Sequence, residues 1–273
     1  MSSLEIFYLA VPFLPLVIFF AAFHRSWQDK ALIEATLVGI ISGAGAAGIV
    51  KYMAYPFVNV LLGIDLRTFV VSMEDPLAKA LVCVFLIGSI EEGAKLSISL
   101  ALLAIFNFLG RAPAIFLAAL GAGLGFSVVE NIAYFNIYGL EVLFAREVIS
   151  TTGHVVFSGI VGLAAAYSLF TPAPGQRRGF WKGYGILVTG LFFAAIFHGL
   201  FNFIALTAPS WTSIPILFLL LVFMVNVMYE AWTRMLLLDE KRQASGWLCS
   251  NCGLKNFGIE RFCPTCGSRV QTQ

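Results

Sequence analysis

Apolar stretches long enough to cross a lipid bilayer dominate this sequence. A transmembrane helix needs about 20 mostly apolar residues. Seven stretches qualify, at 4–23, 31–50, 80–109, 113–137, 147–170, 183–206 and 214–238. None of them has the residue alternation of a membrane β-barrel, so the backbone must satisfy its hydrogen bonds within helices. The sequence therefore predicts an all-α polytopic membrane protein, a bundle of about seven transmembrane helices.

The amino-acid composition excludes several other classes of protein. Hydrophobic residues make up 59% of the 273 residues and charged residues only 12%, whereas soluble chains carry roughly a quarter charged residues. A soluble domain of this size could not bury 26 phenylalanines along with its other apolar side chains. A soluble enzyme, a disordered chain and a disulfide-rich secreted module are therefore excluded. The net charge of +2 gives no reason to expect a nucleic-acid partner.

Flanking residues and loop charges predict how the chain sits in the membrane. The first stretch has no basic segment before it, so we expect a retained helix and not a signal peptide. The less apolar segment 51–79, with Pro56 and Pro76, is expected to form an interfacial or re-entrant helix. Short loops carry about nine basic residues on one side and about four on the other, and the more basic loops face the cytoplasm. We therefore expect a multi-pass protein of the cell membrane with its N-terminus outside and its C-terminus in the cytoplasm.

Ionisable and amide side chains interrupt four consecutive spans. They are Glu91, Glu92 and Lys95 in the third span, Glu130 and Asn131 in the fourth, His154 in the fifth, and His198 and Asn202 in the sixth. Each charged side chain at mid-bilayer costs at least about 2.5–3.5 kcal/mol. A single residue of this kind is often one half of a hydrogen-bonded pair that holds helices together. Three carboxylates and two histidines on successive helices indicate a functional site instead.

The depth of these residues in the membrane is a second argument for one site. With about 1.5 Å of rise per residue, Glu130 and His154 lie about 10 Å from the outer ends of their spans, and His198 about 12 Å. Glu91 lies about 17 Å from the outer end of its own span. Four separate helices therefore place polar groups in one layer of the outer half of the bilayer, where they can meet in a common pocket.

The residue types in this layer suit hydrolysis by an activated water. Imidazole and carboxylate groups bind zinc or another divalent ion well, and a catalytic site keeps one position open for water. We expect Glu92, Glu130, His154 and His198 to hold such an ion. A glutamate would take the proton of the water. Adjacent glutamates point about 100° apart on a helix, so Glu91 and Glu92, which with His198 are the catalytic candidates, should have different roles.

Three further polar residues are expected to support this site. Lys95 follows Glu91 by four residues and Glu92 by three, so it can form an ion pair with either carboxylate. Asn131 lies beside Glu130, and Asn202 lies one turn after His198. Either amide could orient the substrate or stabilise an oxyanion.

Short motifs at these positions are similar to those of one known family. The motifs are Glu-Glu-x-x-Lys at 91–95, Phe-x-x-x-Glu-Asn at 126–131, and His198 followed four residues later by Asn202. In this order on successive helices they resemble the PrsW family of membrane proteases, which is related to the CAAX prenyl endopeptidases. The CAAX enzymes have His in place of Glu130, and some PrsW members have Asp in place of Asn202.

The resemblance covers roughly the third to the sixth span, and it implies both an activity and a set of essential residues. It implies cleavage of membrane-anchored protein or peptide substrates within the bilayer. It also implies that Glu91, Glu92 and His198 are the essential groups. The motifs leave open whether a metal ion activates the water or a glutamate does so directly.

The last thirty or so residues differ in composition from the rest of the chain. Two Cys-x-x-Cys pairs, Cys249 with Cys252 and Cys263 with Cys266, are separated by ten residues. This pattern is typical of a structural zinc site with four thiolate ligands, and reduced cysteines agree with a cytoplasmic location. Trp247 and Asn256 resemble the framework of Ran-binding-protein-type zinc fingers, which bind ubiquitin or single-stranded RNA. Because the segment has few basic residues, we favour a protein-interaction or regulatory module over nucleic-acid binding, with a purely structural tail as the alternative.

Together these features predict a protease in two parts. Residues 1–240 would form the transmembrane helical protease domain and residues 245–270 a cytoplasmic zinc ribbon. The leading hypothesis is an intramembrane endopeptidase, expected to be a metalloprotease, that uses a metal- or glutamate-activated water. The alternatives are a proton- or cation-coupled transporter or channel, and a non-catalytic membrane scaffold that recruits partners through its zinc ribbon.

Overall fold

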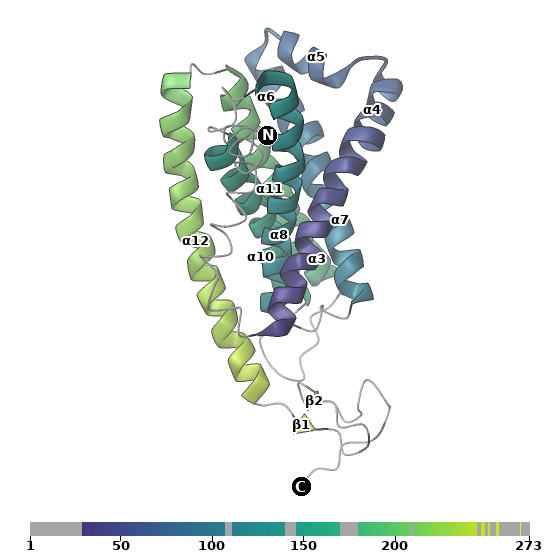
Figure 1. Ribbon diagram of the computed structural model, residues 1–273, viewed down its shortest axis with the longest axis vertical. Coiled ribbons are helices and arrows are strands. Elements are labelled where there is room, and N and C mark those ends of the chain that lie inside the picture. The colour runs from purple at the N-terminus through teal and green to yellow at the C-terminus, as the bar shows by residue number, and fades with distance from the viewer. Residues whose placement is uncertain are drawn as a thin grey trace, which may run out of the picture.

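The computed structural model describes residues 29–106, 111–139, 146–169, 180–207, 210–244, 247–248, 251, 255–256 and 268. The predicted first span, 4–23, lies outside these residues, as do the four cysteines of the predicted zinc ribbon. The described chain is almost entirely helical (Figure 1).

One long helical rod forms the first described part of the chain. Helix α3, Lys30–Ile49, begins at Asp29, whose side chain accepts a hydrogen bond from the amide of Ala31 and so caps the helix. It continues through the π-helical turn η3, Val50–Ala54, into α4, Tyr55–Leu62, and ends at Gly63, which is left-handed with φ 66°. The π-turn accommodates Pro56, which lacks an amide hydrogen. Residues 51–62 therefore extend the second predicted span and do not form a separate interfacial helix.

Two short helices lead from this rod into the third span. Helices α5, Leu66–Ser72, and α6, Pro76–Val82, begin at Asp65 and Asp75, whose side chains accept hydrogen bonds from backbone amides of the first turn. Helix α6 continues through η4, Cys83–Gly88, into α7, Ser89–Ile105. In Figure 1, α5 lies at the upper end of the bundle.

The remaining helices complete the bundle. They are α8 (Ala112–Tyr138), η7 (Arg146–Ser150) continuing into α10 (Thr151–Leu169), α11 (Phe180–Thr207) and α12 (Ser210–Ala244). At the lower end of Figure 1, the two-residue strands β1 (Trp247–Leu248) and β2 (Lys255–Asn256) pair in antiparallel fashion.

Five of the described helices are long and apolar enough to cross a membrane. They are Lys30–Leu62, Ala112–Tyr138, Arg146–Leu169, Trp181–Thr207 and Pro215–Leu237. The helical run from Pro76 to Ile105 is not among them, because Glu91, Glu92 and Lys95 lie in its middle. The described residues thus support the predicted helical membrane protein, with five candidate spans where the sequence suggested about seven.

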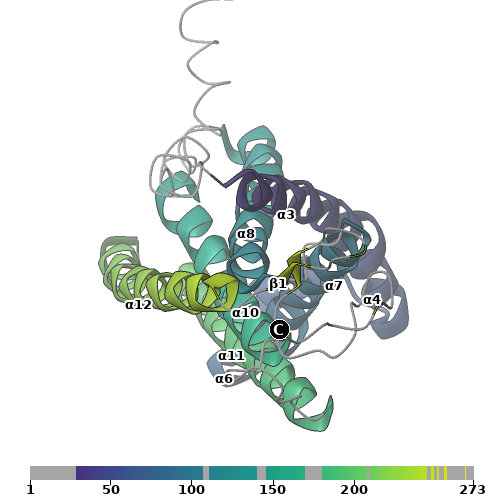
Figure 2. The same cartoon turned by 90° about the horizontal axis from the view of Figure 1, so that it is seen from below.

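Helix α8 occupies the centre of the bundle. It packs between α3 and α10, and the view along the bundle places α8 between α3 and α12 (Figure 2). The contact with α3 depends on residues without side chains: a Cβ added at Gly43 would lie only 1.9 Å from the carbonyl oxygen of Ala122. Close backbone approach of this kind is how helices pack where lipid surrounds them.

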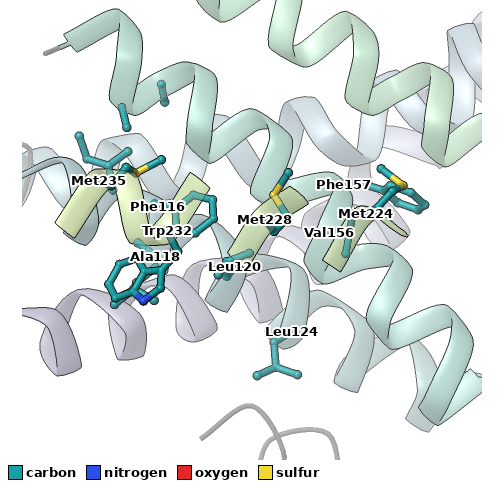
Figure 3. Packing of buried hydrophobic residues seen from close by; sticks show 14 of the residues in the cluster. Phe116, Ala118, Leu120, Leu124, Val156, Phe157, Met224, Met228, Trp232 and Met235 are labelled. Carbon is teal, nitrogen blue, oxygen red and sulfur yellow. The ribbon is translucent and has the colours of Figure 1, made fainter. Parts of the chain in front are cut away.

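Helix α12 covers one side of the bundle through a single apolar stripe. Met224, Met228, Trp232 and Met235 recur every three or four residues, are buried, and pack against α8 and α10 (Figure 3). The indole of Trp232 stacks on Phe116, with ring centroids 6.1 Å apart. Large apolar side chains on the opposite face of α12 are exposed, as expected for a surface that contacts lipid.

Candidate active site

Glu91 and Glu92 lie in the first turn of α7, and Lys95 lies one turn further along. Their exposed fractions are 4%, 0% and 2%, so three ionisable groups are buried together in the middle of the bundle. Helix α11 comes close enough to reach them because Gly199 has no side chain. A Cβ at that position would lie 2.3 Å from the Cα of Val84 in η4.

Both carboxylate oxygens of Glu92 accept hydrogen bonds from side chains. Its Oε1 atom accepts from Lys95 Nζ at 2.7 Å and lies 2.8 Å from His198 Nδ1, and its Oε2 atom accepts from Ser158 Oγ at 3.1 Å. Because a carboxylate can only accept, His198 donates from Nδ1, and its Nε2 atom keeps a lone pair. Glu92 therefore holds the imidazole ring of His198 in place through Nδ1, and Lys95 neutralises the charge of Glu92.

His154 of α10 is held between a cation and a carboxylate. Its Nδ1 atom lies 3.0 Å from Lys95 Nζ, and its Nε2 atom lies 2.9 Å from Glu130 Oε2. The ammonium can only donate, so Nδ1 accepts and the Nε2–H group donates to Glu130. The backbone of α10 reaches this position because Gly123 of α8 leaves room: a Cβ there would lie 2.3 Å from the carbonyl oxygen of His154.

Glu91 is bound by the protein through one oxygen only. Its Oε1 atom accepts a hydrogen bond from the hydroxyl of Tyr55 at 2.5 Å. Its Oε2 atom is buried, has no hydrogen-bond partner among the described residues, and lies 3.5 Å from His198 Nε2. An unsatisfied carboxylate oxygen and an imidazole lone pair thus face one another across a short gap.

The charges of this cluster are incompletely balanced. Glu92 pairs with Lys95 at 2.7 Å, and Glu130 pairs with Arg146 at 2.7 Å. Among the described residues, Glu91 has no such cationic partner. A buried carboxylate without a counter-charge is costly, so this position suits a positive ion.

Glu91, His154 and His198 can offer ligand atoms that all lie within 4.8 Å of one another. Two histidines and one carboxylate form a ligand set used by catalytic zinc. Among the described residues, Glu91 Oε2 and His198 Nε2 accept no hydrogen bond. Both atoms therefore have a lone pair available for a metal ion. His154 would have to exchange its contact with Lys95 for the ion. These residues therefore fit a divalent metal.

A family model described as PrsW family intramembrane metalloprotease matches residues 30–229, which is most of the chain. The chain belongs to the PrsW family. As a PrsW protein it is an integral membrane protease, an endopeptidase that acts on membrane-embedded substrates. No curated protein and no solved structure matches the chain.

The described geometry of this PrsW protein differs from the expected ligand set. The expected set contained Glu92 and Glu130, whereas each of these carboxylates instead accepts a hydrogen bond from one of the two histidines. Glu91, expected only as a catalytic group, lies with His154 and His198 in the candidate metal group.

The two supporting asparagines lie in different surroundings. Asn131 donates from Nδ2 to Glu147 Oε1 at 3.1 Å and to Thr151 Oγ1 at 2.9 Å, and it accepts from Arg146. It therefore organises the start of η7 and α10 and does not face the gap beside Glu91. Asn202 is half-buried one turn after His198, and within the described part of the chain no hydrogen bond joins it to the cluster.

Three residues that contact the cluster were absent from the sequence-based candidates. Ser158 follows His154 by four residues, so their shared helix face was a usable signal. In the sequence, Arg146 was counted only among the basic residues of the short loops. Its pairing with Glu130 depends on how η7 packs against α8. Tyr55 lies in the segment expected to be interfacial, and nothing in its neighbourhood indicates that it reaches Glu91.

Proposed function

We propose that Glu91, His154 and His198 hold a divalent metal ion, zinc being the best match, and that this site hydrolyses the peptide bond. The observation that carries the proposal is the buried Oε2 atom of Glu91, which has no hydrogen-bond partner among the described residues and faces His198 Nε2 at 3.5 Å. The other two carboxylates of the cluster already have cationic partners. Among the described residues of this cluster, Glu91 is the carboxylate without a lysine or arginine partner.

The protein residues around the site have separate tasks in this proposal. An ion held by three protein ligands leaves a position for water, lowers the pKa of that water and polarises the scissile carbonyl. Glu92 fixes the ring of His198 through Nδ1, and Glu130 fixes the ring of His154 through Nε2. Carboxylates that hold ligand histidines in this way set ring orientation and tautomer. Tyr55 donates a hydrogen bond to the other carboxylate oxygen of Glu91, Oε1.

A second candidate mechanism uses the same oxygen atom. Without an ion, Glu91 Oε2 would itself take the proton from the attacking water, as a general base. The Glu91→Gln variant separates the two mechanisms. Metal bound by the parent protein and lost together with cleavage in Glu91→Gln supports Glu91 as a ligand. A parent protein that cleaves without bound metal, and stops cleaving in Glu91→Gln, supports Glu91 as the base.

The test uses full-length protein in which Cys249, Cys252, Cys263 and Cys266 are replaced by Ser, because zinc bound in the tail would mask the membrane site. We expect about one zinc per chain by elemental analysis, and cleavage of a membrane-anchored reporter substrate. His198→Ala should lose both the metal and the cleavage. Full cleavage by both His198→Ala and Glu91→Gln would contradict the assignment of this site.

We also propose the two-part organisation expected from the sequence, with a protease domain at 1–240 and a cytoplasmic zinc ribbon at 245–270. The antiparallel pairing of Trp247 with Asn256 and of Leu248 with Lys255 supports it. In the sequence, the paired residues flank the first Cys-x-x-Cys pair. Zinc analysis of the parent protein against the four-serine variant should differ by one ion per chain.

We propose a protein partner for the cytoplasmic zinc ribbon.

We also propose that the N-terminus lies outside the cell and the C-terminus in the cytoplasm. The excess of basic residues in one set of loops supports this orientation. A single cysteine placed in the α5 segment should react with a membrane-impermeant maleimide on intact cells. A single cysteine placed after residue 244 should not react, and the reverse pattern would contradict the orientation.

A further inference from the structure

Arg146 pairs with the carboxylate that holds one of the candidate metal ligands. The side chains of Arg146 and Glu130 are 17% and 23% exposed. Among the described residues the Arg146 side chain makes three contacts, all with α8. It donates from Nη2 to Glu130 Oε2 at 2.7 Å and from Nε to Asn131 Oδ1 at 3.1 Å, and its guanidinium lies 3.6 Å from the ring centroid of Tyr134. These contacts fix the orientation of the guanidinium, and its positive charge is permanent.

These contacts determine where the Glu130 carboxylate points. Its Oε2 atom is shared between Arg146 Nη2 and His154 Nε2. Glu130 consequently touches a candidate metal ligand without belonging to the group formed by Glu91, His154 and His198. A carboxylate at that position is attracted strongly to a divalent ion when nothing else neutralises it.

Resting on the function proposed above, we infer that Arg146 is a positioning residue that keeps Glu130 out of the metal coordination sphere. Zinc sites with four protein ligands are closed and structural, whereas catalytic sites have three and an open position. The Arg146–Glu130 ion pair holds this site at three protein ligands. Without Arg146, Glu130 would be released from its ion pair and could become a fourth protein ligand.

The chain offers a matched control for the loss of Arg146. The guanidinium of Arg67 in α5 lies 5.4 Å from the ring centroid of the same Tyr134, and its side chain is exposed. Within the described part of the chain it forms no ion pair with Glu130. Replacing Arg67 removes an arginine from the same ring without releasing Glu130.

The experiment measures whether the bound metal has an exchangeable position. The full-length four-serine variant is loaded with Co²⁺, and its visible d–d spectrum is titrated with azide, which binds only at an open position. We expect an azide-dependent spectrum for the four-serine protein, for Arg67→Ala and for Glu130→Gln. Arg146→Ala should retain Co²⁺ but bind azide at least about tenfold more weakly. The double variant Arg146→Ala, Glu130→Gln should recover azide binding.

Three results would overturn the inference, and two would overturn the proposed metal site instead. The inference fails if Arg146→Ala binds azide like the four-serine protein, if the double variant does not recover, or if Arg67→Ala loses azide binding too. If Arg146→Ala does not fold, as judged by its thermal unfolding, Arg146→Gln is measured against the same criteria. A four-serine protein that binds no Co²⁺, or binds it equally after His198→Ala, contradicts the metal site itself.

Discussion

Two adjacent glutamates of identical chemistry have different surroundings in this protein. Among the described residues, Glu92 accepts hydrogen bonds from three side chains, whereas Glu91 accepts one, through Oε1, and its Oε2 atom accepts none. The difference follows from the rotation of about 100° per residue in an α-helix, which turns Glu92 towards Lys95 and Ser158 and Glu91 towards Tyr55. Position on the helix, and not the intrinsic acidity of the side chain, separates their roles.

At this scale we expect Tyr55→Phe to weaken metal binding. The change removes the one hydrogen bond to Glu91 Oε1, so the carboxylate is no longer held with a single oxygen towards the histidines. Metal affinity should fall about tenfold or more, and substrate cleavage should fall with it, as measured by competition with a zinc chelator and by a reporter assay. Tyr52→Phe is the control, because Tyr52 is 71% exposed on the same rod. Equal affinities in both variants would contradict a role for Tyr55.

The helices converge on the site where residues without side chains let their backbones approach. Gly199 stands next to His198 in α11, and a Cβ there would lie 2.3 Å from the backbone of Val84. Gly123 allows the same approach between α8 and the backbone of His154. Helix packing by small residues therefore sets the distances within the polar cluster.

At the scale of elements, Gly199→Ala should destabilise the protein and impair the site. The added methyl group forces η4 and α11 apart, which should lower the free energy of unfolding by about 1–3 kcal/mol. Cleavage should decrease as well, because His198 moves with α11. Gly45→Ala is the control: a Cβ at Gly45 has nothing within 4 Å, so alanine there should be neutral or stabilising by about 0.5–1 kcal/mol. Thermal unfolding in detergent compares the two, and an unchanged Gly199→Ala would refute the packing argument.

An ion-pair cluster joins three distant parts of the chain at one end of the bundle. Arg111, at the start of α8, donates to Asp29 before α3 at 2.7 Å and to Asp239 in α12 at 2.7 Å. Asp239 is only 7% exposed. Since α12 otherwise contacts the bundle through one apolar stripe, this cluster attaches its far end, from which the chain continues into the tail.

For the whole molecule, Arg111→Gln should loosen the attachment of α12. Loss of these charge-assisted hydrogen bonds should lower the free energy of unfolding by about 1.5–3 kcal/mol and speed amide hydrogen exchange near residues 235–244. Arg234→Gln is the control, since Arg234 and Glu230 form a pair whose side chains are 68% and 66% exposed. Surface pairs contribute little, so no measurable change is expected there. Equal exchange in both variants would contradict the attachment.

The membrane class, the helical architecture and the residues worth considering follow from the amino-acid sequence alone. A charged group in lipid is so costly that Glu91, Glu92, Lys95 and Glu130 stood out without any structure, and helical rise placed them with the histidines in one layer. Which atoms face one another depends instead on how the helices pack. Rotation of each helix about its axis depends on packing with its neighbours, and this rotation set Glu91, not Glu92, opposite the free nitrogen of His198. Contacts from outside the motifs, those of Tyr55 and Arg146, depend on chain segments that meet only in the folded bundle.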